Sequence, residues 1–210
     1  MLTVTYHGGA LLANVEAQGV YLGSDWASNS ALSNQAANLD KFLGYVVNSP
    51  YMDMLTQAGY NVGRGSAVAG QTLNLSLNKS TGVTDTQIRG QLQAAINSGQ
   101  LAAPDANRLY VVYVEPGVVI RDGADTSQNS FLGYHGAFAG RTAGGAAADI
   151  RYAIMAYPGT PNPSAGSQGF ASAMDQLTSV SSHELAEAVT DPDVDYKQLG
   201  WYDDQLDGEI

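Results

Sequence analysis

Three side chains near the C-terminal end of the sequence have the types and the spacing of a metal site. His183 and Glu187 lie four residues apart, and Glu184 follows His183 directly. In a helix, a four-residue spacing places two side chains on one face, one turn apart. The pattern is the zinc-binding motif His-Glu-x-x-His with its second histidine replaced by glutamate, and both imidazole and carboxylate are zinc ligands. The spacing therefore predicts that His183 and Glu187 bind a metal ion, although the same pattern also occurs on ordinary solvated helices.

A catalytic zinc usually has three protein ligands and a water molecule, so the helix supplies two of the ligands. We expect Glu184 to be the general base that takes a proton from this water. Glu209 is the first candidate for the third ligand, because it is acidic, lies downstream of the helix and follows Gly208, which lets the backbone approach closely. The alternative is that Glu209 is simply solvated.

Two aspartates and one more histidine are further candidates. Asp191 lies two turns after His183 on roughly the same face, and Asp193 lies ten residues after it. Asp191 can equally be a turn residue that ends the helix before Pro192. His135 lies in a Gly-Tyr-His-Gly segment that we expect on a strand near the motif helix, where it could bind metal or stabilise an oxyanion. The alternative for His135 is a hydrogen-bonded structural role.

Calcium is the competing metal, because carboxylates alternate in two places after the helix. The first set is Asp191, Asp193 and Asp195, and the second is Asp203, Gln205 and Asp207, followed by Gly208. The second set matches the first half of an EF-hand loop without the glutamate of its twelfth position, and the first set lacks the glycine. Both sets can also be solvated carboxylates, so the spacing leaves zinc and calcium open.

The composition restricts the class of protein. The chain has 210 residues, of which 44% are hydrophobic and 14% charged, and its formal net charge is −11. This charge argues against nucleic acid and anionic membranes as partners, because both require basic patches. The absence of cysteine excludes disulfides and thiol catalysis, and no apolar run is long enough to predict a membrane span. No signal peptide is visible, while the excess of carboxylates fits an extracellular setting.

Hydrophobic periodicity predicts alternating strands and helices. Strands are predicted over 2–6, 18–22, 73–78, 109–115, 131–138 and 150–157. Helices are predicted over 32–47 with Ser30 or Ser33 as N-cap, over 51–58, over 85–98 after a Thr84–Gln87 capping box, and over 170–190. Residues 116–130 and 158–169 are predicted to be loops, and residues 191–210 an acidic, irregular tail.

No internal repeat and no strong linker is present, so we expect residues 1–210 to form one α/β (α+β) domain. In this domain a twisted mixed sheet is backed by helices, and the helix near 170–190 is the active-site helix. The order of the elements resembles the N-terminal half of zincin metallopeptidases. Trp201 and Tyr202 are large apolar residues in the acidic tail, and their burial predicts that residues 191–210 fold back against this helix.

Several segments resemble the EXORDIUM/phosphate-induced protein family in patches over most of the chain. They are Thr-Tyr-His-Gly-Gly-Ala-Leu-Leu at 5–12, Phe-Leu-Gly-Tyr-His-Gly at 131–136, residues 152–158, residues 182–192, Gly-Trp-Tyr-Asp at 200–203 and Gly-Glu-Ile at 208–210. The plant members are secreted cell-wall proteins linked to growth. The bacterial-type members, with His-Glu-x-x-Glu and Thr-Asp-Pro, look like zincin-like metalloproteins. The resemblance therefore implies an extracellular protein.

The leading interpretation is a secreted zinc-dependent hydrolase, specifically a metallopeptidase that uses metal-activated water on a peptide or cell-wall substrate. The first alternative is a non-catalytic extracellular or cell-wall protein in which His183, Glu184 and Glu187 form a structural or vestigial site. The second alternative is a calcium-stabilised carbohydrate-binding module.

Overall fold

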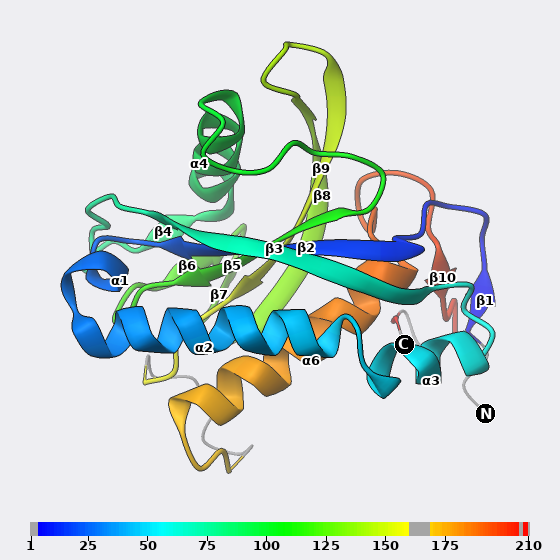
Figure 1. The fold of residues 1–210 in the computed structure, drawn as a ribbon, viewed down its shortest axis with the longest axis horizontal. Coiled ribbons are helices and arrows are strands. Elements are labelled where there is room, and N and C mark those ends of the chain that lie inside the picture. Colours follow the sequence, from blue (N-terminus) through cyan, green and yellow to red (C-terminus); the bar gives the residue numbers. More distant parts are fainter. Residues whose placement is uncertain (1–3, 160–168, 206–207, 210) are drawn as a thin grey trace.

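A five-stranded sheet forms the centre of the computed structural model, which describes residues 4–159, 169–205 and 208–209 (Figure 1). The sheet order is β3-β2-β5-β9-β8. The strands are β2 (Asn14–Leu22), β3 (Gly63–Leu73), β5 (Arg108–Val114), β8 (Gly133–Arg141) and β9 (Ala147–Met155). Four strands run parallel, whereas β8 runs antiparallel to β9 and forms one edge. The mixed α/β architecture that the sequence predicts is therefore confirmed.

Five helices accompany these strands in the described part of the chain. They are α1 (Asp25–Ser28), α2 (Ser30–Val46), α3 (Pro50–Gln57), α4 (Asp85–Asn97) and α6 (Ala173–Thr190). The capping box of Thr84 and Gln87 at the start of α4 is confirmed. The predicted N-cap of α2 is wrong. Asn29 caps this helix instead of Ser30 or Ser33, because its side-chain oxygen accepts hydrogen bonds from two free N–H groups of the first turn.

Alternating side chains of the central strand β5 divide the core between the two faces of the sheet. Leu109, Val111 and Tyr113 pack on the face that is covered by α2, α3 and α6. Tyr110 and Val112 pack on the opposite face, beneath α4. Figure 1 shows α2 and α6 on one side of the sheet and α4 on the other. A strand covered on both faces needs a continuous apolar run, and this is the pattern that predicts β5.

Two predictions, one of a strand and one of a loop, need correction. The strand predicted over 73–78 is wrong, because β3 ends at Leu73 and the residues after it form no strand. Leu75 and Leu77 alternate because they pack against the core from an irregular segment. The loop predicted over 116–130 contains β6 (Ile120–Asp122) and β7 (Asp125–Thr126), which form a small sheet with β4 (Val83–Thr84).

The described part of the tail folds back onto the body of the protein. Strand β10 (Trp201–Tyr202) pairs antiparallel with β1 (Thr5–Tyr6), so that two segments far apart in the sequence lie side by side (Figure 1). The indole N–H of Trp201 donates a hydrogen bond to the carbonyl of Tyr60, at 3.0 Å. The backbone N–H of Gly200 donates to the Asp191 carboxylate, at 2.8 Å. These contacts bring the end of the described chain close to the C-terminal half of α6.

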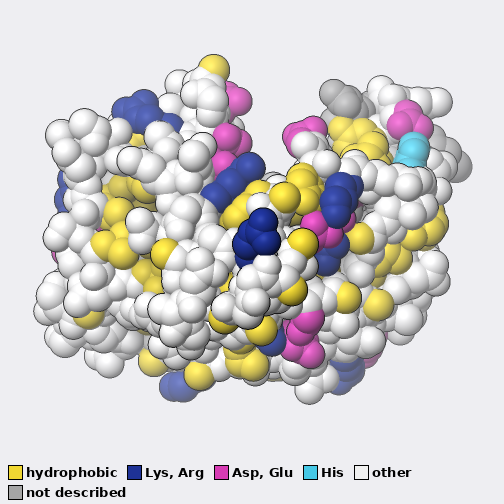
Figure 2. All heavy atoms as spheres, turned by 90° about the horizontal axis from the view of Figure 1, so that it is seen from above, with side chains coloured by type: hydrophobic (Ala, Val, Ile, Leu, Met, Phe, Trp, Pro, Cys, Tyr) yellow, Lys and Arg dark blue, Asp and Glu magenta, His cyan; other side chains and the backbone are white. Residues whose placement is uncertain are grey.

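The surface carries a mixture of charges on the face drawn in Figure 2, where Lys and Arg side chains lie among Asp and Glu side chains. This face therefore presents no single basic area. Among the described residues, no helix has the length and apolar character needed to cross a membrane.

Candidate metal centre

A cleft between the edge strand β8 and the helix α6 gathers the side chains that could bind a metal. The cavity has a volume of about 380 Å³, and its lining includes His135, His183, Glu184, Glu187 and Glu209. Strand β8 contributes His135, α6 contributes the next three, and the returning tail contributes Glu209. One turn of α6 therefore faces the edge of the sheet across this cleft.

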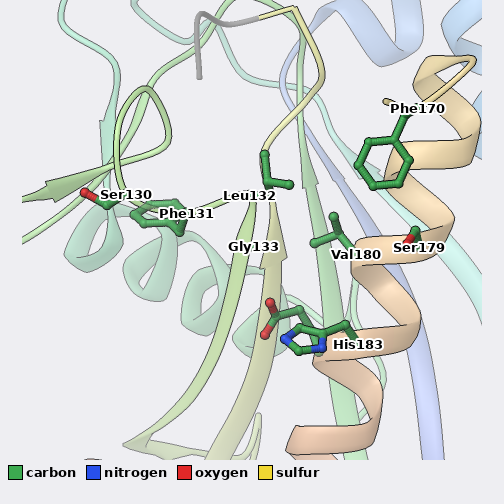
Figure 3. Close-up of a pocket in the computed structure, with 9 residues that line it drawn as sticks. Ser130, Phe131, Leu132, Gly133, Phe170, Ser179, Val180 and His183 are labelled. Carbon is green, nitrogen blue, oxygen red and sulfur yellow. The ribbon is translucent and has the colours of Figure 1, made fainter. Parts of the chain in front are cut away.

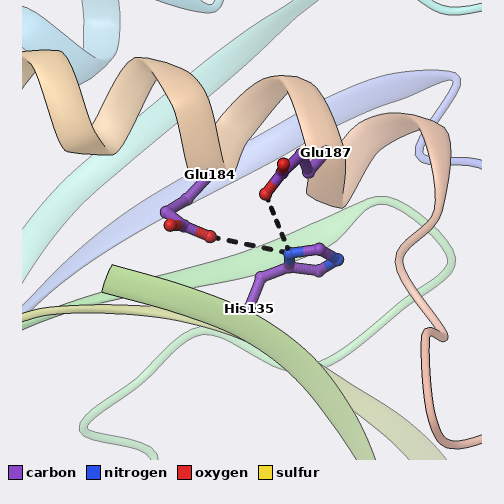
Figure 4. A group of neighbouring side chains, drawn as sticks. All are labelled: His135, Glu184 and Glu187. Carbon is purple, nitrogen blue, oxygen red and sulfur yellow. Dashed lines mark ion pairs between the residues drawn. The ribbon is translucent and has the colours of Figure 1, made fainter. Parts of the chain in front are cut away.

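The tightest group in the cleft consists of one imidazole and two carboxylates (Figure 4). His135 Nδ1 lies 3.6 Å from Glu184 Oε2 and 3.8 Å from Glu187 Oε2. One ligand atom from each of the three residues lies within 4.8 Å of the other two. Ligand atoms that share one ion at bonds of about 2.0–2.2 Å lie at most about 4.4 Å apart, so only small side-chain shifts separate these three residues from a common ion. We call His135, Glu184 and Glu187 the metal group.

The orientation of His135 is fixed from the side opposite the two glutamates. Its Nε2 lies 3.0 Å from the backbone carbonyl of Asp191 and 3.2 Å from Glu209 Oε1. A carbonyl can only accept a hydrogen bond, so Nε2 must carry the proton. In the neutral ring Nδ1 then has a lone pair that points toward Glu184 and Glu187. A histidine that binds metal through one nitrogen and donates from the other to a carbonyl has this arrangement.

The electrostatics of the cleft favour the uptake of positive charge. Burial, together with the charges of Glu184 and Glu209, raises the pKa of Glu187 to about 8, against a smaller opposing effect of His135. Burial would lower the pKa of His135, but its contacts with Glu184 and Glu209 outweigh burial and raise the pKa. Buried carboxylates this close together are stabilised by a proton or by a cation.

Three buried carboxylate oxygens accept no well-aligned hydrogen bond among the described residues, although two of them lie 3.2 Å and 3.6 Å from the ring nitrogens of His135. They are Glu184 Oε2, Glu209 Oε1 and Asp191 Oδ2. Two of them belong to side chains that line the cleft. An unsatisfied buried carboxylate oxygen is costly unless an ion or water completes its coordination. The donor set of one imidazole and two carboxylates therefore fits a divalent ion such as zinc.

The structure places the residues expected to bind the metal, or to act as its general base, at different positions in the cleft. The His183 side chain is 64% exposed, and its Nε2 lies 3.2 Å from Glu187 Oε1, the oxygen of Glu187 that does not face His135. Glu184, expected as the general base, is buried and lies in the metal group. Glu209, the first candidate for the third ligand, reaches the cleft but contacts the Nε2 side of His135.

The two aspartate candidates have other partners. Asp191 is fully buried, does not line the cavity, and accepts the N–H of Gly200 with Oδ1. Burial raises the pKa of Asp191 to about 6, although the hydrogen bond from Gly200 opposes this shift. Asp193 forms a buried ion pair with Arg151, with Oδ1 at 2.8 Å from Nε. The side chains of Asp191 and Asp193 are thus directed to different partners and form no loop around a common ion.

The second acidic set lies only partly within the described residues, because Asp207 is outside them. In the described part, Asp203 Oδ1 accepts the backbone N–H of Gln205, at 2.9 Å. This contact is a local turn, and Asp203 is buried rather than solvated.

Comparisons with known proteins give no match. No protein-family model matches the chain, no curated protein matches its sequence, and no solved structure matches its fold. The chemistry of the cleft therefore has to be argued from its own residues.

Sequence reasoning gave His135 too little weight. The residue lies at the centre of the metal group, yet it is separated from the helix motif by 47 residues of sequence, from 136 to 182. The available signal was a histidine between two glycines, Gly133 and Gly136, in a predicted strand. Only the antiparallel pairing of β8 with β9, and the packing of α6 beside them, brings it to the glutamates.

Proposed function

We propose that this protein is a zinc-dependent hydrolase acting on peptide bonds, in which His135, Glu184 and Glu187 hold the ion. The observation that carries the proposal is the convergence of one imidazole and two carboxylates, with a fourth ionisable group, Glu209, beside them, in an open cleft at the edge of a sheet. Two ionised glutamates and a neutral histidine would neutralise a divalent ion. Zinc, when bound, acts as a Lewis acid that polarises water and the substrate carbonyl.

The remaining cleft residues have separate tasks in this proposal. Hydrolysis joins the oxygen of water to the carbonyl carbon, breaks the carbon–nitrogen bond and delivers a proton to the leaving nitrogen. His183 is exposed at the cleft and contacts Glu187, so its imidazole is placed to move that proton. Glu209 and the Asp191 carbonyl hold the ring of His135 from its Nε2 side.

The main competing arrangement uses His183, Glu187 and Glu209 as ligands and Glu184 as the general base. The two arrangements differ most clearly at Glu184 and His183, while Glu187 is a ligand in both. In our arrangement Glu184→Gln removes a ligand and His183→Ala removes only a proton carrier. In the competing arrangement Glu184→Gln removes only the general base, and His183→Ala removes a ligand.

Zinc titration of the purified protein and its variants tests the proposal. We expect Glu184→Gln to lower zinc affinity by more than the roughly 10–100-fold that outer-shell changes cost. We expect His183→Ala to keep zinc and to lose about 10²–10⁴-fold in peptide hydrolysis. His7→Ala is the control for the loss of a histidine, because His7 does not line the cleft and its Nε2 lies 3.5 Å from Asp204 of the tail. Zinc retained by Glu184→Gln and lost by His183→Ala would establish the competing arrangement.

The same titration addresses the other interpretations. Stoichiometric zinc without hydrolysis of any peptide would favour a structural site in a non-catalytic protein. Preferential binding of calcium would favour the carbohydrate-binding alternative, for which the partners of Asp191 and Asp193 give no support. Secretion and the zincin-like architecture remain part of the proposal, and they rest on the sequence resemblance and on the placement of the motif helix beside the sheet.

A further inference from the structure

A second cavity adjoins the metal group and shares side chains with it. This cavity has a volume of about 440 Å³ and lies between the start of β8 and the N-terminal half of α6. His183 and Glu184 line it, and both also line the cavity that holds the metal group. A ligand bound at the metal group can therefore extend directly into the second cavity.

Aromatic and aliphatic side chains form the walls of this second cavity (Figure 3). Phe131 and Phe170 lie on opposite sides of it, and Leu132 and Val180 lie between them. An aromatic ring placed between two others can adopt the tilted and edge-on contacts that aromatic pairs prefer. His183, Glu184 and two serines complete the lining, so the apolar walls between Phe131 and Phe170 are the part that suits an aromatic side chain.

The open edge of β8 offers a backbone partner next to this cavity. Leu132 accepts a hydrogen bond from Ala156, so it belongs to the set of residues that bond toward β9. In an antiparallel pair the alternate residues, Gly133 and His135, direct their N–H and C=O groups to the other side. An extended peptide can pair with such an edge.

The far end of the same edge is already covered. The backbone N–H of Arg141 donates to the Gln93 side chain at 2.8 Å, and the Arg141 carbonyl accepts from it at 2.9 Å. The cover lies at the end of β8 that is remote from the cleft. Among the described residues, no backbone hydrogen bond covers this edge at Gly133 and His135 beyond the pairing with β9. Gly133 lines both cavities, and His135 lines the cavity of the metal group.

We infer that the second cavity binds an aromatic side chain of the peptide substrate, whose backbone lies along β8 at Gly133 and His135. This inference rests on the proposed function and adds the substrate class. The scissile bond would lie at the metal group, one or two residues from the aromatic side chain.

Two fluorescent peptides that differ only in one residue, Phe or Ala, test the inference with the zinc-loaded full chain. Binding is measured by anisotropy and cleavage by chromatography. We expect the Phe peptide to bind at least about tenfold more tightly, the lower limit for a well-filled apolar pocket. Ser179→Trp, an exposed position on the cavity wall, should fill the cavity and remove this preference.

Two further variants make the test specific. Ala37→Trp places the same side chain at an exposed position of α2, and it should keep the preference for Phe. Phe170→Ala removes one wall without filling the cavity, and it should reduce the preference. Zinc affinity should be unchanged in all three variants.

The outcomes separate this inference from the proposed function. Equal binding of the two peptides, no binding of either, or a preference for Phe that survives Ser179→Trp would overturn the aromatic cavity. Tighter binding of the Phe peptide without cleavage supports the cavity and contradicts the hydrolase. Cleavage without a preference for Phe supports the hydrolase and contradicts the cavity.

Discussion

Glu187 is the residue at which protons and metal are expected to compete most strongly. One of its oxygens faces His135 and the other faces His183. Its pKa rises from an ordinary value of 4.5 to about 8, chiefly through burial. The folded protein therefore binds a proton here that the unfolded chain releases at neutral pH. A metal ion that occupies the same oxygens must displace this proton.

The pH dependence of the metal-free protein follows from this shift. A raised folded-state pKa contributes stability that is complete below the unfolded value and is lost as the pH passes the folded value. For Glu187 the loss falls between about pH 4.5 and 8, and for His135 it falls between about pH 6.5 and 10. We predict that the free energy of unfolding of the metal-free protein, measured with urea, decreases from about pH 5 to pH 9.

Glu187→Gln is the matched test of this prediction, because the amide keeps the shape but cannot titrate. The decrease below about pH 8 should become shallower in this variant. A metal-free protein whose stability rises over the same range would contradict the assignment of the shift to Glu187.

Sequence reasoning worked for elements whose signals are local and failed for elements that depend on partners. The capping box of α4 and the continuous apolar run of β5 each predict an element from neighbouring residues. Strand β3 was missed because its many glycine, alanine and serine residues show no alternation, and its pairing with β2 is what makes it a strand. The cleft could not be predicted for the same reason, because no local sequence pattern indicates that β8 and α6 lie side by side.

The packing of β8 against α6 depends on the missing side chain of Gly133. A Cβ atom at this position would lie 2.6 Å from Val180 Cγ1 and 3.1 Å from Glu184 Oε1. We predict that Gly133→Ala lowers the free energy of unfolding by about 1–3 kcal/mol, as overpacking does. It should also weaken zinc binding, because Glu184 must move. Denaturant unfolding and zinc titration measure the two effects.

Gly44→Ala is the control for the Gly133→Ala variant. Gly44 lies in α2, and a Cβ there would have no neighbour within 4 Å. Alanine should therefore stabilise the helix by about 0.5–1 kcal/mol. A neutral effect of alanine at Gly133 would mean that β8 and α6 pack less closely than the structure indicates.

At the scale of the whole molecule, the tail depends on the close approach of Gly200 to the end of α6. A Cβ at Gly200 would lie 2.1 Å from the carbonyl oxygen of Thr190. Gly200→Ala should therefore separate the tail from α6 and break the hydrogen bond to Asp191. We predict faster limited proteolysis within residues 191–205 and weaker zinc binding.

Gly90→Ala, on the exposed side of α4 with no neighbour within 4 Å of its Cβ, provides the comparison. It should leave the proteolysis rate of the tail unchanged. Equal rates of tail cleavage in Gly200→Ala and in the unmodified protein would show that the tail is held by other contacts.

The pairing of β1 with β10 has a consequence for the order of events during synthesis. Because Thr5 pairs with Tyr202, strand β1 leaves the ribosome well before its partner and must wait until residue 202 has been made. Contacts between segments so distant in sequence close late, since the loop entropy must be overcome first. Glu209 follows β10, so it can reach His135 only after this closure. The contact of Glu209 with His135 is therefore among the last to form, after the three residues of the metal group have already been synthesised.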